Sequence, residues 1–524
     1  MPAANLQAQT STAPATPVTA NTAALPLLGD GSDMTSADER RLGDRIAREI
    51  YRDPDYLDDP VLADYVQGVW QPLLVAARAR GDLTPELDER FAWKVMLGRD
   101  RSVNAFALPG GYLGVHLGLL AVVSSRDELA SVLGHELSHV TQRHISRLIA
   151  KDSQQAPWVI GAMILGALAA SKNPDAGNAL IVGGQALSAQ SQLNFSRDME
   201  READRVGFGV MTQAGFEAQG FVTMFDKLQQ ASRLNDNGGY AYLRSHPLTT
   251  ERIADMQSRL PLGAPHQGSA QEPTAVHAMM TARARVLSNP GVDALRSWQA
   301  PVDDPSLTAL PVARQAGALY GAALAAIRQR NAESARRNLQ QLQALKLADA
   351  EAVHTVRWLG AEIDLAAHDL SLTQVRELAK TLGLASPASQ PMSKMRRPEL
   401  ILQAQAALQI NQPDALNTVA QSLQSWLADH PQDSLAWQWL ASLYATQNQS
   451  LRALRAEAEA QAARLDYTGA LDRLRAAQER VKAGGTRQPS ADHIDASIID
   501  TRLRQIDALL KAQQADRKAG SGPA

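Results

Sequence analysis

Two histidines and a glutamate are spaced for metal chemistry in the stretch LGHELSHVTQRH, residues 133–144. On an α-helix, residues four apart lie on one face about 6 Å apart, so His135 and His139 can point both imidazoles at one ion. Glu136, one position along, can reach a water molecule at that ion and act as a general base. This H-E-x-x-H spacing is typical of zinc hydrolases and predicts one Zn²⁺ per chain. The alternative is a polar patch on a buried helix.

The third histidine of this stretch, His144, is not part of the predicted site. It comes five residues after His139, which places it about 140° round a continuous helix. We interpret it as a solvated histidine or one at the edge of the core.

A second helix, in FSRDMEREADRVG (residues 195–207), offers the acidic group that a zinc site still needs. A catalytic zinc has three protein ligands and one open position. Glu200 is suitable as the third ligand, and Asp204, one turn later, can accept a hydrogen bond from the second nitrogen of a ligand histidine. Ala203 and Gly207 are small enough to let this helix pack closely against the histidine helix. Alternatively, Glu200 is an exposed member of a charged cluster with Arg197, Arg201 and Arg205.

The segment SHPLTTER, residues 245–252, supplies two candidates for stabilising charge during the reaction. Amide hydrolysis develops negative charge on an oxygen, which a cation or an N–H donor can stabilise, as His246 or Arg252 would. Arg252 could also form a structural salt bridge with Asp204. Because Pro247 stiffens the loop and neutral imidazole is a good zinc ligand, His246 could instead take the open fourth position. The enzyme would then be latent until the loop moved.

The elements that must position these residues are indicated by capping and alternation patterns. SADE, residues 36–39, has the form of a capping box at the start of a helix. FAWKVMLG (residues 91–98) has apolar side chains at period two and predicts a strand. NAFALPGGYLGVH (residues 104–116) predicts a strand, a Pro-Gly-Gly turn and a second strand. A second capping box, Ser125 to Glu128, opens the histidine helix.

The C-terminal half repeats a helical pattern in which large and small residues alternate. In the segment 437–460, Trp437, Leu440, Ala441 and Tyr444 are followed by Ala453 and Ala460, which is the spacing of a tetratricopeptide helix pair. An ordinary helical bundle with alanine contacts is the alternative.

We therefore predict a mainly α fold class. An α+β peptidase domain with a small sheet and the H-E-x-x-H helix is followed by an all-α tetratricopeptide-like repeat domain. The predicted boundaries are a disordered leader over 1–35, the peptidase domain over 36–262, a linker over 263–275, the repeat domain over 276–483, and a C-terminal helix with a disordered tail over 484–524.

Charge and composition exclude some classes of protein. The net charge of −3 and the lack of a long basic block give no reason to expect a nucleic acid partner. The absence of cysteine excludes disulfides, cysteine nucleophiles and thiolate metal ligands.

Two stretches bear on membranes and targeting. Residues 1–26 lack the charged and apolar regions of a signal peptide, and we interpret them as a disordered leader of the kind left when a signal is removed. Two apolar stretches within 158–189 are too short to span a bilayer. They predict a helical hairpin that caps the active-site cleft or lies in a membrane surface. A hairpin buried in the core is the alternative.

Residues about 36–260 resemble the zinc peptidases of the HtpX and CAAX-protease superfamily, most specifically those of the periplasmic BepA (YfgC) type. The resemblance rests on NAFALPGG, GHELSHVTQRH, EREAD and SHPLTTER, which occur in family order. The tetratricopeptide-like half extends the resemblance to most of the chain. It also separates this type from HtpX proteins, which carry transmembrane helices.

The resemblance implies roles for particular residues. His135, His139 and Glu200 would bind the zinc, and Glu136 would be the general base. The family's ligand is the first glutamate of the E-x-x-A-D pattern, which favours Glu200 over Glu202. An edge strand near the NAFAL motif would hold an extended peptide by backbone pairing, with Asn104, Ala105, Phe106 and Ala107 as the residues in contact.

The resemblance also implies a setting, since proteins of this type act as proteases and chaperones for outer-membrane proteins in Gram-negative bacteria. We expect a zinc-dependent periplasmic endopeptidase with a chaperone-like role on misfolded or stalled outer-membrane proteins. The repeat half would bind these clients or the outer-membrane assembly machinery, with peripheral membrane contact as a further expectation. The competing hypothesis is an assembly chaperone or adaptor whose repeats carry the function and whose protease site is mostly latent. A zinc amidase acting on cell-wall peptides fits less well, because the edge strand suits an extended polypeptide.

Overall fold

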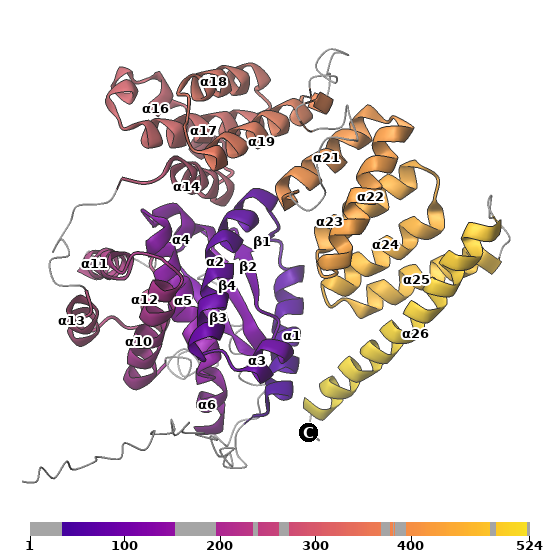
Figure 1. Ribbon diagram of the computed structural model, residues 1–524, viewed down its shortest axis with the longest axis horizontal. Helices are drawn as coiled ribbons and strands as arrows, with labels where there is room; N and C mark the ends of the chain where they lie inside the picture. The colour runs from indigo at the N-terminus through magenta and orange to yellow at the C-terminus, as the bar shows by residue number, and fades with distance from the viewer. Residues whose placement is uncertain are drawn as a thin grey trace, which may run out of the picture.

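The computed structural model describes residues 34–151, 195–233, 239–260, 272–367, 378–380, 382, 395–482 and 489–520. Helices dominate this part of the chain and surround one small sheet, so the predicted mainly α fold class is confirmed (Figure 1). None of the described helices is both long and apolar enough to cross a bilayer. The predicted hairpin within 158–189 lies outside the described residues.

The N-terminal half contains the sheet and ten described helices. The strands are β1 (Tyr56–Leu57), β2 (Lys94–Gly98), β3 (Ala105–Leu108) and β4 (Tyr112–His116). The helices are α1 (Ser36–Arg52), α2 (Pro60–Arg80), α3 (Pro85–Arg90), α4 (Leu117–Val122), α5 (Arg126–Thr141), α6 (His144–Lys151), α10 (Arg197–Gln213), α11 (Gln219–Arg233), α12 (Tyr242–Ser245) and α13 (Thr250–Ser258).

The sheet has the order β1-β2-β4-β3, so β3 is an edge strand, as the resemblance implies. β3 and β4 are antiparallel and joined through Pro109–Gly111, which confirms the predicted strand, turn and strand. The Asn104 carbonyl accepts a 3.0 Å hydrogen bond from the His116 N–H. Because antiparallel pairs alternate between bonded and non-bonded, the N–H and C=O groups of Ala105 and Ala107 point to the free edge.

The helix that carries the H-E-x-x-H motif, α5, packs against β3, α2 and α10. It begins at the predicted box, because the Ser125 hydroxyl accepts a hydrogen bond from the Glu128 N–H. Two glycines let α5 and α10 approach closely. A Cβ at Gly207 would lie 2.9 Å from the backbone of Gly134 and of His135. The predicted close packing of these helices is confirmed.

The capping box predicted at residues 36–39 is wrong by one residue. α1 is capped by Thr35, whose hydroxyl accepts a hydrogen bond from the Asp38 N–H. Ser36 instead donates to a carboxylate oxygen of Glu86 at 2.7 Å. Glu39 is buried and pairs with Arg143 at 3.0 Å. Because Thr35 already accepts the capping hydrogen bond at the helix N-terminus, Ser36 and Glu39 are available for tertiary contacts.

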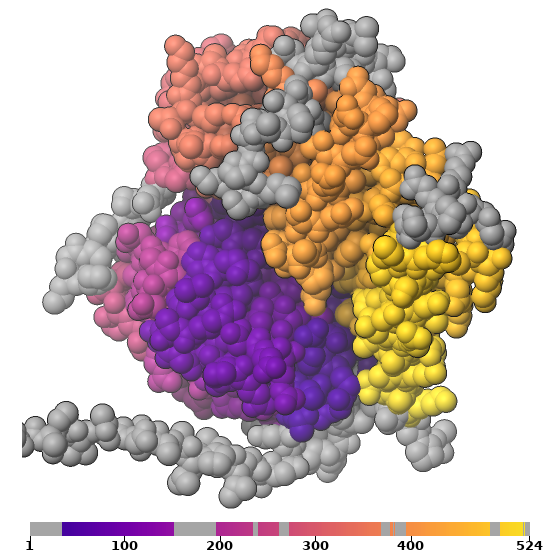
Figure 2. All heavy atoms as spheres, turned by 45° about the vertical axis from the view of Figure 1, so that its right-hand side comes forward, coloured from indigo at the N-terminus to yellow at the C-terminus, as the bar shows by residue number. Residues whose placement is uncertain are grey.

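The C-terminal half is helical throughout its described residues and curves around the N-terminal half, with its first helices above that half and its last helices to the right in Figure 1 (Figures 1 and 2). Its helices are α14 (Ala275–Ser288), α15 (Val292–Ser297), α16 (Ala300–Asp303), α17 (Val312–Arg328), α18 (Ala332–Ala344), α19 (Ala350–Ala366), α21 (Arg397–Ile410), α22 (Pro413–Asp429), α23 (Ser434–Thr446), α24 (Ser450–Ala463), α25 (Tyr467–Lys482) and α26 (Pro489–Gly520), with a 3-10 turn at Pro305–Ala309. Helices adjacent in sequence pack in pairs, as α23 does on α24. Five of the six residues that suggested a repeat are buried, namely Leu440, Ala441, Tyr444, Ala453 and Ala460.

The two halves share one apolar core. Buried side chains from α1, α2 and α5 are continuous with those of α14, α17 and α19. A buried ion-pair group reinforces this contact, since Arg283 on α14 lies 2.7 Å from both Asp59, the cap of α2, and Glu362 on α19. The halves therefore pack as one rigid unit at this point.

Candidate active site

Four side chains from three segments converge in the N-terminal half. His135 and His139 come from α5, Glu200 from α10, and His246 from the residue that ends α12. One ligand atom from each lies within 4.8 Å of all the others, and all four residues are buried. We refer to these four side chains as the ligand cluster.

The spacing within the ligand cluster suits a tetrahedral ion. The Nε2 atoms of His135 and His139 are 3.0 Å apart. His246 Nδ1 lies 3.3 Å from His135 Nε2 and 3.0 Å from Glu200 Oε1. Tetrahedral zinc with bonds of about 2.0–2.1 Å separates its ligand atoms by about 3.3 Å. Imidazole nitrogens and a carboxylate also form a donor set that suits zinc.

The electrostatics of the cluster favour the ligand forms of His139 and Glu200. Burial lowers the pKa of His139 well below its usual value, which keeps the imidazole neutral. Burial would raise the pKa of Glu200, but His246, His139 and His135 outweigh it and hold that pKa well below its usual value. An ionised carboxylate beside a neutral imidazole is ready to bind a cation. Glu200 is only 2% exposed, which excludes the exposed-cluster alternative.

Asp204 and Arg252 contact the outer atoms of two members of the ligand cluster, His135 and Glu200. Asp204 Oδ1 lies 2.9 Å from the second ring nitrogen of His135, the partner expected for it. Arg252 donates to both oxygens of Asp204 at 2.6 and 2.8 Å and lies 2.7 Å from Glu200 Oε2. The salt bridge considered between Arg252 and Asp204 is present, and the guanidinium also pairs with Glu200. Arg252 also donates to the Pro247 carbonyl at 2.8 Å and lies over the Phe225 ring.

The interpretation of His144 as a solvated or core-edge histidine is wrong. It is fully buried, and its Nδ1 lies 2.9 Å from Nδ1 of His139. The argument from helical periodicity fails because α5 ends at Thr141 and Arg143 adopts a left-handed φ of 52° before α6 begins. The other ring nitrogen of His144, Nε2, lies 3.1 Å from Glu202. Burial lowers the pKa of His144 to about 4. Glu202 is outside the ligand cluster, as expected.

The two carboxylate oxygens of Glu136 have different surroundings. Oε2 accepts a 2.8 Å hydrogen bond from the Ala107 N–H on the free edge of β3. Oε1 lies 3.5 Å from His246 Nε2, beside the cluster. Burial raises the pKa of Glu136, against the opposing effects of His246 and His135. A carboxylate with raised proton affinity next to a cation site has the properties of a general base.

Of the residues predicted to hold a peptide, Ala105 and Ala107 turn their backbone groups outward and Phe106 does not. The Phe106 ring lies over Gly114 of β4, where even a Cβ would be 2.1 Å from it. Asn104 pairs its carbonyl with β4, as described above. The outward backbone groups of this edge therefore belong to two of the four residues, and the Ala107 N–H is already bonded to Glu136.

Two aromatic residues that the sequence did not single out line the cluster. Tyr242 stacks on His246 with ring centroids 4.5 Å apart, and Phe195 stacks on His139 at 3.9 Å. The Tyr242 N–H donates to the Val103 carbonyl at 3.1 Å, which ties α12 to the start of β3. Isolated aromatics carry no spacing pattern, so only tertiary contacts could identify them.

Comparison with known proteins agrees with this geometry. The model of peptidase family M48 matches residues 77–260. The beta-barrel assembly-enhancing protease of Escherichia coli (strain K12) is 30% identical over 504 residues, covering 93% of this chain and 92% of that protein. A Vibrio cholerae protein is 36% identical over 242 residues, or 45% of this chain and 47% of its own length. The mitochondrial metalloendopeptidase OMA1 of Saccharomyces cerevisiae is 27% identical over 201 residues, covering 37% of this chain and 55% of that protein. The chain therefore belongs to peptidase family M48 and is a metalloendopeptidase of the beta-barrel assembly-enhancing protease type.

Proposed function

We propose that this protein is a zinc-dependent endopeptidase with a chaperone-like role toward misfolded or stalled outer-membrane proteins in the periplasm. The observation that carries the proposal is the buried ligand cluster with Glu136 between it and the free edge of β3. The names of full-length relatives, which refer to beta-barrel assembly, support the choice of client.

Zinc would be held by His135, His139 and Glu200, and it would supply a Lewis acid that activates water and polarises a carbonyl. The substrate would lie along β3 as an added strand, paired with the outward backbone groups of Ala105 and with the Ala107 carbonyl, since the Ala107 N–H bonds to Glu136. Glu136 Oε1 would take a proton from the attacking water and return it to the leaving amine nitrogen. The bond between Oε2 and the Ala107 N–H keeps the base in register with the substrate strand.

A second candidate, an assembly adaptor whose protease site is mostly latent, is favoured by the position of His246. Its Nδ1 lies among the ligand atoms, where it would complete four-fold coordination and exclude the nucleophile. The same loop position also puts Nε2 near Glu136. Latency and proteolysis are thus two states of one site, separated by a movement of the loop.

Metal analysis of the full chain, with and without Glu136→Gln, tests the proposal. Both proteins should hold one zinc, and cleavage of casein or an unfolded outer-membrane protein should fall by about 10²- to 10⁴-fold in the variant, since only the base is removed. His135→Ala and Glu200→Ala should lose zinc affinity. Wild-type protein with one zinc but no cleavage of either substrate would favour the adaptor. Zinc binding that survives Glu200→Ala but not Glu202→Ala would show that the third ligand is misassigned.

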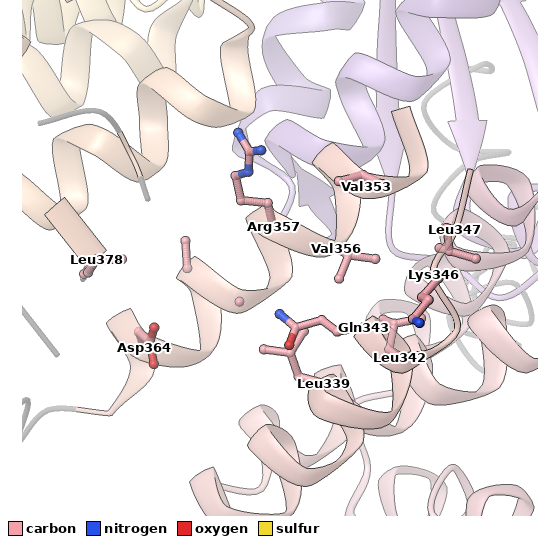
Figure 3. A pocket seen from close by; sticks show the side chains of 12 residues that line it. Leu339, Leu342, Gln343, Lys346, Leu347, Val353, Val356, Arg357, Asp364 and Leu378 are labelled. Atoms are coloured by element: carbon pink, nitrogen blue, oxygen red, sulfur yellow. The ribbon is translucent and has the colours of Figure 1, made fainter. Parts of the chain in front are cut away.

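The repeat half offers a groove for an unfolded client between α18 and α19 (Figure 3). The groove has a volume of about 370 Å³ and an apolar lining that includes Leu339, Val356 and Leu378. Lys346 and Arg357 line it as well, are exposed, and form no ion pair with any described residue. Asp364 also lines the groove but faces Arg336 at 3.5 Å, so the two unpaired cations suit an extended apolar segment that carries acidic side chains.

Charge reversal tests this groove. Lys346→Glu with Arg357→Glu should weaken binding of an acidic segment from an outer-membrane protein by about tenfold or more, because repulsion replaces attraction. Binding would be measured by fluorescence anisotropy at two salt concentrations. Arg337→Glu, at an exposed position on α18 outside the groove lining, is the control and should change little. Equal binding by the double variant and the control would place the client elsewhere.

A further inference from the structure

Three members of the ligand cluster are held from outside by a specific partner. His135 has Asp204 and Glu200 has Arg252. For His139 the partner is His144, whose Nδ1 lies 2.9 Å from the His139 nitrogen that faces away from the cluster. This third partner is not a carboxylate or a carbonyl, which are the usual groups behind a ligand histidine.

We propose that His144 is a positioning residue for the metal centre, which fixes the tautomer and orientation of His139 through a chain that ends at Glu202. The inference rests on the proposed zinc site. It concerns only where protons lie on two imidazoles, and it assigns His144 no contact with substrate.

The chain of hydrogen bonds permits one arrangement of protons. Glu202 is an acceptor when ionised, and its Oε2 also faces Arg147 at 2.9 Å, so His144 donates to it from Nε2. A neutral His144 then has a bare Nδ1, which can accept the Nδ1 proton of His139. With that proton placed, the His139 Nε2 lone pair is free and directed at the cluster, where a cation needs it.

The break between α5 and α6 puts His144 in this position. Arg143 takes the left-handed conformation, and its guanidinium bonds to buried Glu39 at 3.0 Å and to the Met34 carbonyl. These contacts anchor the turn to the start of α1. The next residue, His144, is thereby directed back at His139 with an edge-on ring contact at 4.9 Å. A continuous helix would have turned it away.

Zinc affinity is the first test, measured by competition with a chelator on the full chain. His144→Leu keeps apolar volume but cannot accept a hydrogen bond, and should lower zinc affinity by about 10- to 100-fold. His144→Asn restores an acceptor close to the position of Nδ1 and should recover much of the loss. Arg147→Met keeps the contact between Glu202 and His144 and should stay within about twofold of wild type. A thermal melt would verify that each variant is folded.

Histidine tautomers give a readout that a merely structural role would not change. Long-range ¹H–¹⁵N spectra of the zinc-loaded chain, assigned with the variants, should show His144 protonated at Nε2 and His139 at Nδ1. A His144 protonated at Nδ1, or wild-type zinc affinity in folded His144→Leu, would overturn the proposal. Equal losses in His144→Leu and His144→Asn would mean that His144 acts by packing alone. If wild-type protein bound no zinc, the proposed function would fail instead.

Discussion

At the scale of single residues, His246 is the side chain with two competing roles. It presents Nδ1 to His135 and Glu200, and Nε2 to Glu136, from a short segment that begins at Tyr242. Burial lowers the pKa of His246, but Glu200 and Glu136 reverse that effect and raise it. The position of Nδ1 suits coordination, whereas the raised pKa favours the imidazolium form, which can only donate hydrogen bonds, as to an oxyanion.

Replacing His246 by alanine separates these roles. If it blocks the fourth position, His246→Ala should raise basal cleavage severalfold at saturating zinc, because the nucleophile gains access. If it stabilises the oxyanion, the same change should lower cleavage by roughly 10²-fold. We expect the increase, since Nδ1 already lies among the ligand atoms. Initial rates on casein would be compared with those of Arg244→Ala, an exposed position on the same segment. Depressed activity with normal zinc content would contradict latency.

At the scale of elements, the crossing of α5 and α10 sets the distance between the histidine pair and Glu200. This crossing depends on Gly134 and Gly207, because a Cβ at Gly207 would be 2.9 Å from two backbone atoms of α5. Backbone cannot move aside as a side chain can, so a larger residue must separate the helices.

Gly207→Ala should therefore affect both stability and metal binding. We expect a loss of about 1–3 kcal/mol in the free energy of unfolding from overpacking, together with weaker zinc binding as Glu200 moves away from His135. Urea titration and chelator competition would measure the two effects. Gly209→Ala is the control, since the atoms nearest to its Cβ belong to the flexible end of Arg80. If Gly207→Ala and Gly209→Ala changed stability and zinc affinity by similar amounts, the close crossing at Gly207 would not be what sets the metal site.

What the sequence could predict follows from which contacts are local. Spacing within one helix placed His135 with His139, and the alternation on either side of Pro109 predicted β3 and β4. The contact of His144 with His139 could not be predicted, because the left-handed Arg143 ends the continuous helix that the spacing argument assumed. The capping box failed by one residue because Ser36 and Glu39 have tertiary partners. Periodicity describes a continuous element, and these residues lie at its ends.

At the scale of the whole molecule, the buried group around Arg283 joins the two halves. Its guanidinium pairs with Asp59 and Glu362, which lie in different halves of the chain. Burial would raise the pKa of Asp59, but Arg283 outweighs it and lowers that pKa. A lowered carboxyl pKa contributes stability that is present at neutral pH and is lost only as the pH falls below about 4.

Arg283→Met should leave buried Asp59 and half-buried Glu362 without their cation and cost about 3–5 kcal/mol of unfolding free energy at pH 7. Equilibrium unfolding in urea, followed by tryptophan fluorescence, would measure this. The deficit should shrink in acid as Asp59 becomes protonated. Arg314→Ala breaks the exposed pair with Glu272 and should change stability by less than about 1 kcal/mol. Equal stability of the two variants would mean that the buried group contributes nothing net.

The family match ends at residue 260, but the apolar core of the N-terminal half does not. His277 on α14 accepts a hydrogen bond from the Tyr65 hydroxyl at 2.6 Å and, through its other ring nitrogen, contacts the Val123 carbonyl at 2.9 Å. A peptidase cut at 260 would expose these groups and the faces of α2 and α4 that α14 covers. The segment that the family model matches is thus shorter than the unit of folding. A transplant of this protease into another protein would have to carry α14 along as part of the graft.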